Sequence, residues 1–141
     1  MKKLLLAIFL VFLISVPAIG QDWINTNQAT VAWDAVTQDE GGSPIPVNDS
    51  ISYRVYTKKL PNGAENLVAN TQELQYTLTF GVEGRYLAGV QTVRVPDGET
   101  QEITSTITWS DSTDVVAVPD PFGIVYYARP SNPKGFTPAS P

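Results

Sequence analysis

The sequence predicts an all-β protein, an antiparallel β-sandwich of about seven strands. Between residues 29 and 109, several short stretches alternate apolar and polar side chains, as half-buried strands do. Turn-forming Gly, Pro and Asn residues separate these stretches. No stretch after residue 20 repeats its apolar residues with the 3.6-residue period of a helix. Many short strands joined by turns are typical of a sandwich.

The first twenty residues have the pattern of an export signal. Lys2 and Lys3 precede the apolar run 4–14, and Ala18, Ile19 and Gly20 form a short segment suited to cleavage. A membrane-spanning helix needs about twenty apolar residues, so this run is too short. We therefore expect a signal helix, cleavage after it, and a periplasmic or secreted protein. An uncleaved anchor is the alternative, and we expect membrane contact only through this segment.

The predicted strands follow one another along the chain. The first, 29–35, places Ala29, Val31 and Trp33 on one face. The others are 51–58, a weak strand at 66–69, 76–80, and a hairpin with arms at 85–95 and 99–109. The side chains predicted to form the core are Trp33, Tyr53, Val55, Leu78, Phe80, Tyr86, Val90 and Ile107.

We expect three parts: a signal peptide at 1–20, the sandwich at 21–112, and a Pro-rich C-terminal tail at 113–141. The tail contains one apolar, β-prone run, 122–128, which is a candidate edge strand. Its last dozen residues have the composition of an extended linker.

Four landmarks resemble the fibronectin type III family. Thr30-Val31-Ala32-Trp33 is similar to its second strand, and Tyr53-Arg54-Val55-Tyr56 to its third. Tyr76-Thr77-Leu78-Thr79-Phe80 and Gly84-Arg85-Tyr86 resemble two later segments, in the family's order. The resemblance covers residues 28–110 and implies an immunoglobulin-like sandwich in which the Tyr86 hydroxyl bonds back to the chain. It suggests a bacterial or phage origin.

One departure from the family concerns its first strand, which would begin inside the signal segment. Only residues 22–26 remain for it, so we expect an uncovered sheet edge. The run 122–128 is the candidate to cover this edge. A strand donated by a partner chain is one alternative, and tolerance of the open edge is another. Self-association through the uncovered edge is therefore an expected interaction.

Composition excludes several functions. Seven basic and fourteen acidic residues follow residue 20, so this part has a net charge of about −7 and should repel nucleic acid. The chain has no Cys and no His, which removes disulfides, thiolate ligands and the usual catalytic bases. We predict no catalytic residues, no cofactor or cofactor-binding residues, and no metal ligands.

Two acid-rich loops, 37–49 and 95–101, are candidate binding surfaces. Solvated loop charge is the simpler interpretation, and a Ca²⁺ site in the first loop is the alternative. Trp23, Trp109, Tyr126 and Tyr127 either form a stacking platform or pack beneath the tail. The candidate loop residues are Asp39, Glu40, Asn48, Asp49, Asp97 and Glu99.

These patterns favour a non-catalytic binding or adhesion module that recognises a protein or a cell-surface glycan through its loops. The alternative is a structural component of a surface appendage or virion that assembles by pairing sheet edges. A sandwich serves both functions equally well, so the fold alone does not separate them.

Overall fold

The structure is a computed structural model, and it describes residues 21–139. All regular structure in this range is β, with nine strands in two sheets. The predicted all-β class is therefore confirmed. The same range contains no helix that could cross a membrane. The expected signal helix lies outside the described residues.

The larger sheet is built around two long antiparallel strands, β3 (Ser50–Leu60) and β6 (Gly84–Val95). Next to β3 lies β4 (Glu65–Thr71), and next to β6 lies β9 (Phe122–Tyr126), which in turn pairs with β1 (Asp22–Asn25). Two short strands, β7 (Ile103–Thr104) and β8 (Thr108–Trp109), also pair with β6. The β1–β9 pair alone is parallel among the described strands.

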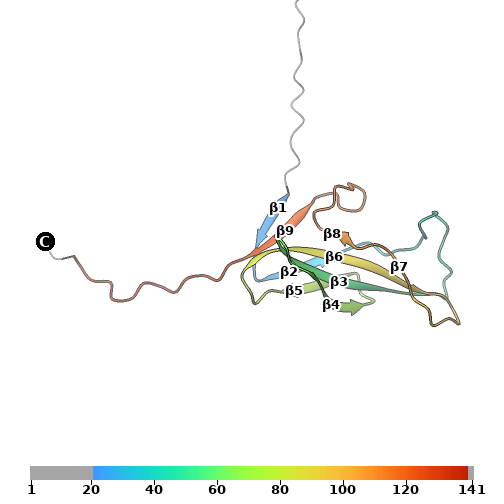
Figure 1. Cartoon of the computed structure of the whole chain (residues 1–141), viewed down its shortest axis with the longest axis horizontal. Coiled ribbons are helices and arrows are strands. Elements are labelled where there is room, and N and C mark those ends of the chain that lie inside the picture. Colours follow the sequence, from blue (N-terminus) through green and yellow to red (C-terminus); the bar gives the residue numbers. More distant parts are fainter. Residues whose placement is uncertain (1–20, 140–141) are drawn as a thin grey trace, which may run out of the picture.

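The smaller sheet has two antiparallel strands, β2 (Gln28–Ala32) and β5 (Gln75–Thr79). Figure 1 shows this pair beside the larger sheet. In β2 the side chains alternate between exposed and half-buried, with Ala29 and Val31 packed against the core. The period-two pattern of the sequence thus buries one face of β2, as predicted.

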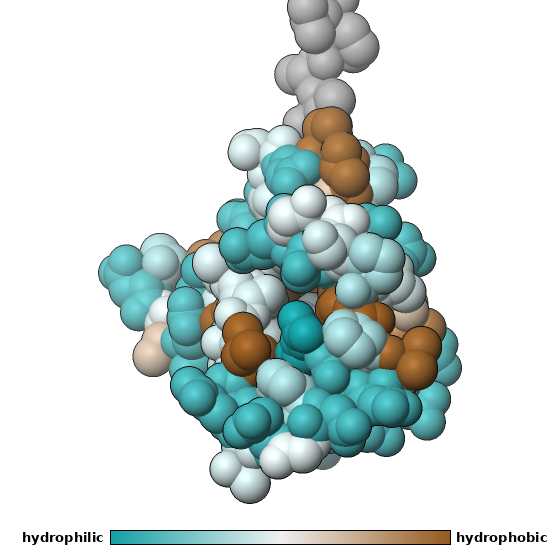
Figure 2. Space-filling model, turned by 90° about the vertical axis from the view of Figure 1, so that its right-hand side faces the viewer, coloured by the Kyte–Doolittle hydropathy of each residue, from teal (hydrophilic) through white to brown (hydrophobic). Residues whose placement is uncertain are grey.

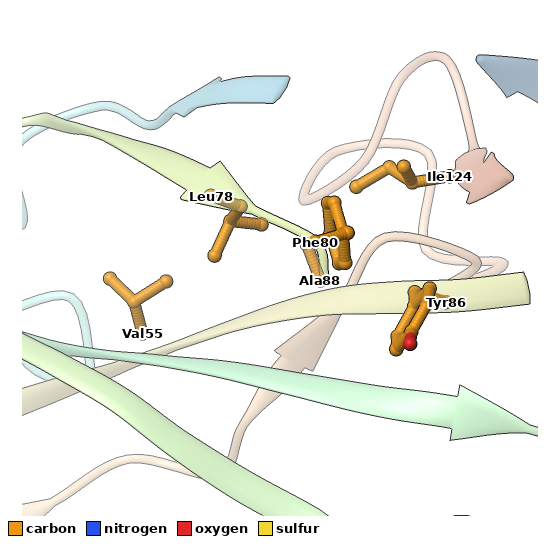
Figure 3. Close-up of a cluster of buried hydrophobic side chains, with 6 residues drawn as sticks. All are labelled: Val55, Leu78, Phe80, Tyr86, Ala88 and Ile124. Atoms are coloured by element: carbon orange, nitrogen blue, oxygen red, sulfur yellow. The ribbon is translucent and has the colours of Figure 1, made fainter. Parts of the chain in front are cut away.

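One hydrophobic cluster joins the two sheets. Its buried members come from β3, β6 and β9 of the larger sheet and from β5 and the residue after it: Val55, Leu78, Phe80, Tyr86, Ala88 and Ile124 (Figure 3). The rings of Phe80 and Tyr86 pack with centroids 4.6 Å apart. Burial of this apolar surface is the main stabilising contribution that the packing shows.

The structure buries five of the eight predicted core residues, including Tyr53. Trp33, Val90 and Ile107 are only half-buried. The predicted strand 99–109 breaks at Ser105, whose hydroxyl accepts a hydrogen bond from the backbone N–H of Thr92 at 3.0 Å. The alternation that placed Ile107 in the core ends at this break, whereas Val90 lies in the unbroken β6, opposite Thr108 of β8.

A tyrosine corner lies at the start of β6, as the family resemblance implies. The hydroxyl of Tyr86 donates a hydrogen bond of 2.5 Å to the carbonyl of Val82. Tyr86 is itself 9 % exposed, so the ring contributes to the core while its polar end is satisfied by the backbone.

The tail contributes β9, which lies within the run 122–128 and pairs on both sides. Ile124 is opposite Tyr86 of β6 and opposite Ile24 of β1. β9 is therefore an inner strand, and β1 is the edge of the larger sheet. The described part of the tail, up to residue 139, does not pair with β2. After β9 the chain leaves the body as a long extended segment (Figure 1).

Candidate functional site

The acids of the first candidate loop organise the loop itself. The carboxylate of Asp39 accepts a hydrogen bond from the N–H of Ser43 at 2.9 Å, and the Asp39 carbonyl accepts one from Gly42 at 3.0 Å. Gly42 has a φ of 81°, which a glycine adopts without strain. Glu40 and Asn48 are exposed to solvent. Asp39 therefore stabilises the turn it belongs to, and Glu40 and Asn48 face the solvent.

Asp49 joins the two candidate loops. Its carboxylate accepts hydrogen bonds from the backbone N–H of Asp97 at 3.0 Å and from Nε of Arg94 at 2.7 Å. The Asp97 N–H, followed by the Arg94 guanidinium, lowers the pKa of Asp49 below its usual value. The Asp49 side chain is only 4 % exposed, and its hydrogen bonds hold the ends of the two loops together. Asp97 and Glu99 stay exposed.

The acidic residues do not converge on a cation site within residues 21–139, where no group of three or more Asp or Glu could hold a metal ion. The end of the molecule at the right of Figure 1 is mostly hydrophilic, with small and separate hydrophobic patches (Figure 2).

A concave feature lies beside β2. It is an open cleft of about 580 Å³ between the segment 31–36, the middle of β6, β8 and the loop 116–120. Aromatic side chains, hydroxyls and two carboxylates line it: Trp33, Tyr53, Trp109, Phe122, Thr92, Ser105, Thr108, Ser110, Asp34 and Asp120. A mostly apolar cleft with a few polar groups is the usual form of a binding site.

The wall formed by the loop 116–120 is held in a defined shape. The carboxylate of Asp114 accepts hydrogen bonds from the N–H groups of Val116 at 3.0 Å and Ala117 at 3.3 Å. Val118 is 9 % exposed and donates its N–H to the Asp114 carbonyl at 2.8 Å. At the base of this loop, Ser110 accepts a hydrogen bond from the N–H of Phe122 at 2.9 Å.

Trp33 stands at the margin between the core and the cleft. Its ring packs on Tyr53 with centroids 5.5 Å apart, and Tyr53 in turn accepts the N–H of Val36 at 3.0 Å. The indole nitrogen of Trp33 is buried without a hydrogen-bond acceptor among the described residues. Trp33 was predicted as core, and the structure places it both against the core and in the cleft lining.

Trp109 forms another part of the cleft. The absence of a side chain at Gly89 makes room for it, because a Cβ at Gly89 would lie 2.8 Å from Cε3 of Trp109. Nζ of Lys58 lies 4.3 Å from the centre of a Trp109 ring, within the range of a cation–π contact. Trp109 is thus fixed from two sides and half-buried.

The other undetermined aromatics lie outside this cleft. Trp23 is 36 % exposed on β1 and carries the guanidinium of Arg85 4.9 Å from its ring centre. Tyr126 of β9 packs against the core, and Tyr127 is 57 % exposed. Neither a single stacking platform nor complete packing under the tail describes these residues.

The outer edge of β2 borders the cleft. Two hydrogen bonds at the ends of the β2–β5 ladder show which residues of β2 bond to β5: Trp33 N to Leu74 O, and Phe80 N to Asn27 O. Residues whose backbone groups face β5 alternate along β2 with residues whose groups face away. The backbone groups of Ala29 and Val31 therefore face β5, and those of Thr30 and Ala32 face away. No hydrogen bond within the described range uses the outward N–H and C=O groups of Thr30 and Ala32.

Thr26 closes one end of this edge. Its hydroxyl accepts a hydrogen bond from the N–H of Gln28 at 3.1 Å and donates one to the Gln28 carbonyl at 2.7 Å. The next two outward-facing residues, Thr30 and Ala32, have no such cap. The open edge is therefore short and lies at the end of β2 that lines the cleft.

Sequence reasoning did not identify the cleft, because its lining comes from five separate segments. It did predict an uncovered sheet edge from the lack of residues for a first strand. That short N-terminal segment pairs with β9 as β1, so the outer edge of β2 stays open in the described range.

Comparisons of this chain with protein-family models, with curated proteins and with solved structures found no match.

Proposed function

We propose that this chain is an exported, non-catalytic binding domain with a fibronectin type III-like sandwich, and that its cleft takes an extended segment of a polypeptide. The open edge of β2 carries this proposal. Thr30 and Ala32 direct outward backbone groups that have no partner in the described range, and Ala32 lines the cleft. An added strand gains main-chain hydrogen bonds from such an edge, while the adjacent lining selects its side chains.

The strand arrangement supports the sandwich. The four landmarks of the family resemblance fall on β2, β3, β5 and the start of β6, in the expected order. The two sheets share one hydrophobic cluster, and Tyr86 makes the expected corner hydrogen bond. Export is supported by the signal-like residues 1–20 alone.

The lining of the cleft supports binding over catalysis. It offers aromatic faces, hydroxyls and the carboxylates of Asp34 and Asp120. The chain has no His or Cys that could act there as a base or nucleophile. Aromatic and hydroxyl groups contribute contact area and orientation, which is what recognition requires.

The cleft is a better candidate than the acidic loops. The carboxylate of Asp49 already accepts hydrogen bonds from Arg94 and Asp97, and that of Asp39 accepts one within its own turn. The remaining loop acids are solvated, and exposed charges of this kind contribute little binding free energy. We therefore assign recognition to the β2 edge and its cleft.

A library of displayed peptides about eight residues long, screened beside a glycan array, tests this assignment. Bound peptides are expected to carry apolar residues at alternate positions. Ala32→Pro should abolish binding, because it removes an outward N–H that an edge strand can lose without unfolding. Val47→Ala is the matched control, since Val47 is 97 % exposed on a loop.

Thermal unfolding of the Ala32→Pro variant checks that its fold is intact. Peptide binding that survives in an intact Ala32→Pro variant would contradict the proposal. Sugar binding that is lost in Trp109→Ala and retained in Ala32→Pro would instead assign the cleft to a glycan.

A further inference from the structure

We infer that the polypeptide taken by the cleft is the C-terminal tail of a second copy of this chain, so that copies associate head to tail. This inference rests on the proposed function, because it names the partner of the same cleft. The tail is available for such a contact. Its last hydrogen bond within the described range is from Ala128 N to Glu83 Oε1, at 2.6 Å. Residues 129–139 are exposed.

Charge favours this pairing. All fourteen acidic residues lie between Asp22 and Asp120, whereas Arg129 and Lys134 in the tail face no acid of their own segment. Asp34 and Asp120 line the cleft, and the described residues include no salt bridge to either of them. A basic segment and an acidic cleft attract each other.

The residues between Pro133 and Pro138 suit an added strand. Pairing with Thr30 and Ala32 needs two N–H groups that are two residues apart, and Gly135 and Thr137 supply them. Phe136 then lies between them with its side chain on the opposite face. It is 96 % exposed in the tail, so burial in the cleft would remove a large apolar surface from water.

An antiparallel register gives the outward backbone groups of β2 hydrogen-bond partners and brings opposite charges together. With Gly135 opposite Ala32 and Thr137 opposite Thr30, Phe136 lies opposite Val31, whose side chain faces the core. Lys134 then lies opposite Trp33 and next to Asp34. The ammonium group can contact the indole face and a carboxylate together.

Both flanking prolines are compatible with this register. Pro138 would lie opposite Ala29, where the backbone of the added strand faces away from β2 and needs no N–H. Pro133 lies beyond the last paired residue. Gly135 has a φ of 65° in the free tail and must become extended, a change that glycine permits.

The tail of the same copy does not fit this site. β9 runs from Phe122, at the cleft, to Tyr126, opposite Gly84. At about 3.3 Å per residue, the chain from Ala128 to Lys134 spans about 20 Å, which is the length needed to return along β9 without a turn. Pro130 and Pro133 stiffen this short segment. A second copy avoids the reversal.

A contact between a tail and a cleft joins two different surfaces. Each copy retains a free cleft at one end and a free tail at the other, so association continues into chains or closes into rings. The expected contact is small, with two paired residues and one aromatic side chain, so the fraction of associated copies depends on their local concentration.

Sedimentation velocity of the purified protein at increasing concentration is the first measurement. The full chain is expected to associate, and a chain ending at Ala128 is expected to stay monomeric. Phe136→Ala should weaken association about tenfold or more. Lys134→Glu should weaken it as well, with an effect that salt reduces. Asn132→Ala is the matched control in the same tail and should associate normally.

A mixing experiment separates the two surfaces. The Ala32→Pro variant keeps a tail and loses the edge, while the chain ending at Ala128 keeps the edge and loses the tail. Each alone is expected to be monomeric, and the mixture is expected to form a one-to-one dimer. If the mixture stays monomeric, or if the truncated chain associates like the full one, the inference is overturned.

A synthetic peptide of residues 129–141 distinguishes failure of this inference from failure of the proposed function. If the truncated chain binds library peptides in a manner that Ala32→Pro abolishes but does not bind this peptide, only the inference fails. If it binds no extended peptide at all, the proposed function fails as well.

Discussion

The outer edges of β6 and β2 differ in what covers them. Beyond β3, β6 is paired with β9 at its start, with β8 near its middle and with β7 at its end. Beyond β5, β2 has no strand beside it in the described range. Every segment after residue 100 that forms a strand adds to the larger sheet. The smaller sheet is left with an edge that can accept another strand.

The two edges also differ in burial. Ile124, on the strand that covers β6, is fully buried, whereas Val31 beside the open edge is half-buried. A covered edge contributes to stability, and an open edge leaves a cleft free for recognition. The following substitutions test whether this division between stability and recognition is real.

The largest effect is expected for Ile124→Ala on the covered side. Removal of a fully buried isoleucine side chain should lower the free energy of unfolding by about 2–5 kcal/mol, measured by urea denaturation. Val31→Ala is the counterpart at the open edge and should cost less than about 2 kcal/mol. Equal losses at the two positions would remove the contrast between the edges.

Gly89→Ala tests the floor of the cleft. The added Cβ would lie 2.8 Å from Cγ2 of Ile107 and from Cε3 of Trp109, so the indole must move. We expect a loss of about 1–3 kcal/mol and a change in tryptophan fluorescence. Gly81→Ala is the control, because nothing lies within 4 Å of a Cβ there. An unchanged spectrum would show that Trp109 is not held as described.

Tyr86→Phe removes only the corner hydrogen bond on the covered half of β6. Loss of the 2.5 Å contact with Val82 should reduce the free energy of unfolding by about 1 kcal/mol, measured by thermal or urea unfolding. Tyr127→Phe should change nothing measurable, since Tyr127 is exposed. A similar loss in both variants would mean that the corner bond is not the cause.

Asp49→Asn should have the smallest effect, and one that depends on pH. The pKa of Asp49 is lowered in the folded state, so its carboxylate stabilises the fold above the unfolded pKa of about 4. That stabilisation is lost as the pH falls through the folded pKa. The wild-type protein should therefore exceed the variant in stability near neutral pH and approach it in acid.

Urea denaturation across this pH range measures the difference. Asp97→Asn is the control, because the exposed Asp97 binds Asp49 through its backbone N–H, which the substitution retains. A stability difference between wild type and Asp49→Asn that stayed constant into acid would rule out the carboxylate as its source.

The sequence predicted the strands of the body well, because each depends on local alternation. The predicted strand 51–58 lies within β3, 76–80 overlaps β5, and 85–95 lies within β6. The arm 99–109 became two short strands, since the Ser105 hydroxyl occupies a backbone position of the ladder. No local sequence pattern predicts this hydrogen bond to a side chain, because its donor is Thr92 in another strand.

The candidate site was harder to predict. Asp49 was expected among the binding residues, yet its carboxylate binds Arg94, 45 positions away, and links two segments of the fold. Trp33 was expected in the core, and it also lines a cleft with Trp109. Both outcomes depend on contacts between distant segments, and residue type alone does not specify them.

The sequence by itself determined the central strands of the body, most of the side chains that face inward from them, and the acidic balance of the body against its basic tail. These properties follow from backbone geometry and composition, and they need no knowledge of neighbours. The tertiary structure decided which strands lie side by side. It paired the segment 22–25 with β9, and it left the β2 edge open beside the cleft. Pairing is a choice among competing long-range contacts, and only the folded chain resolves it.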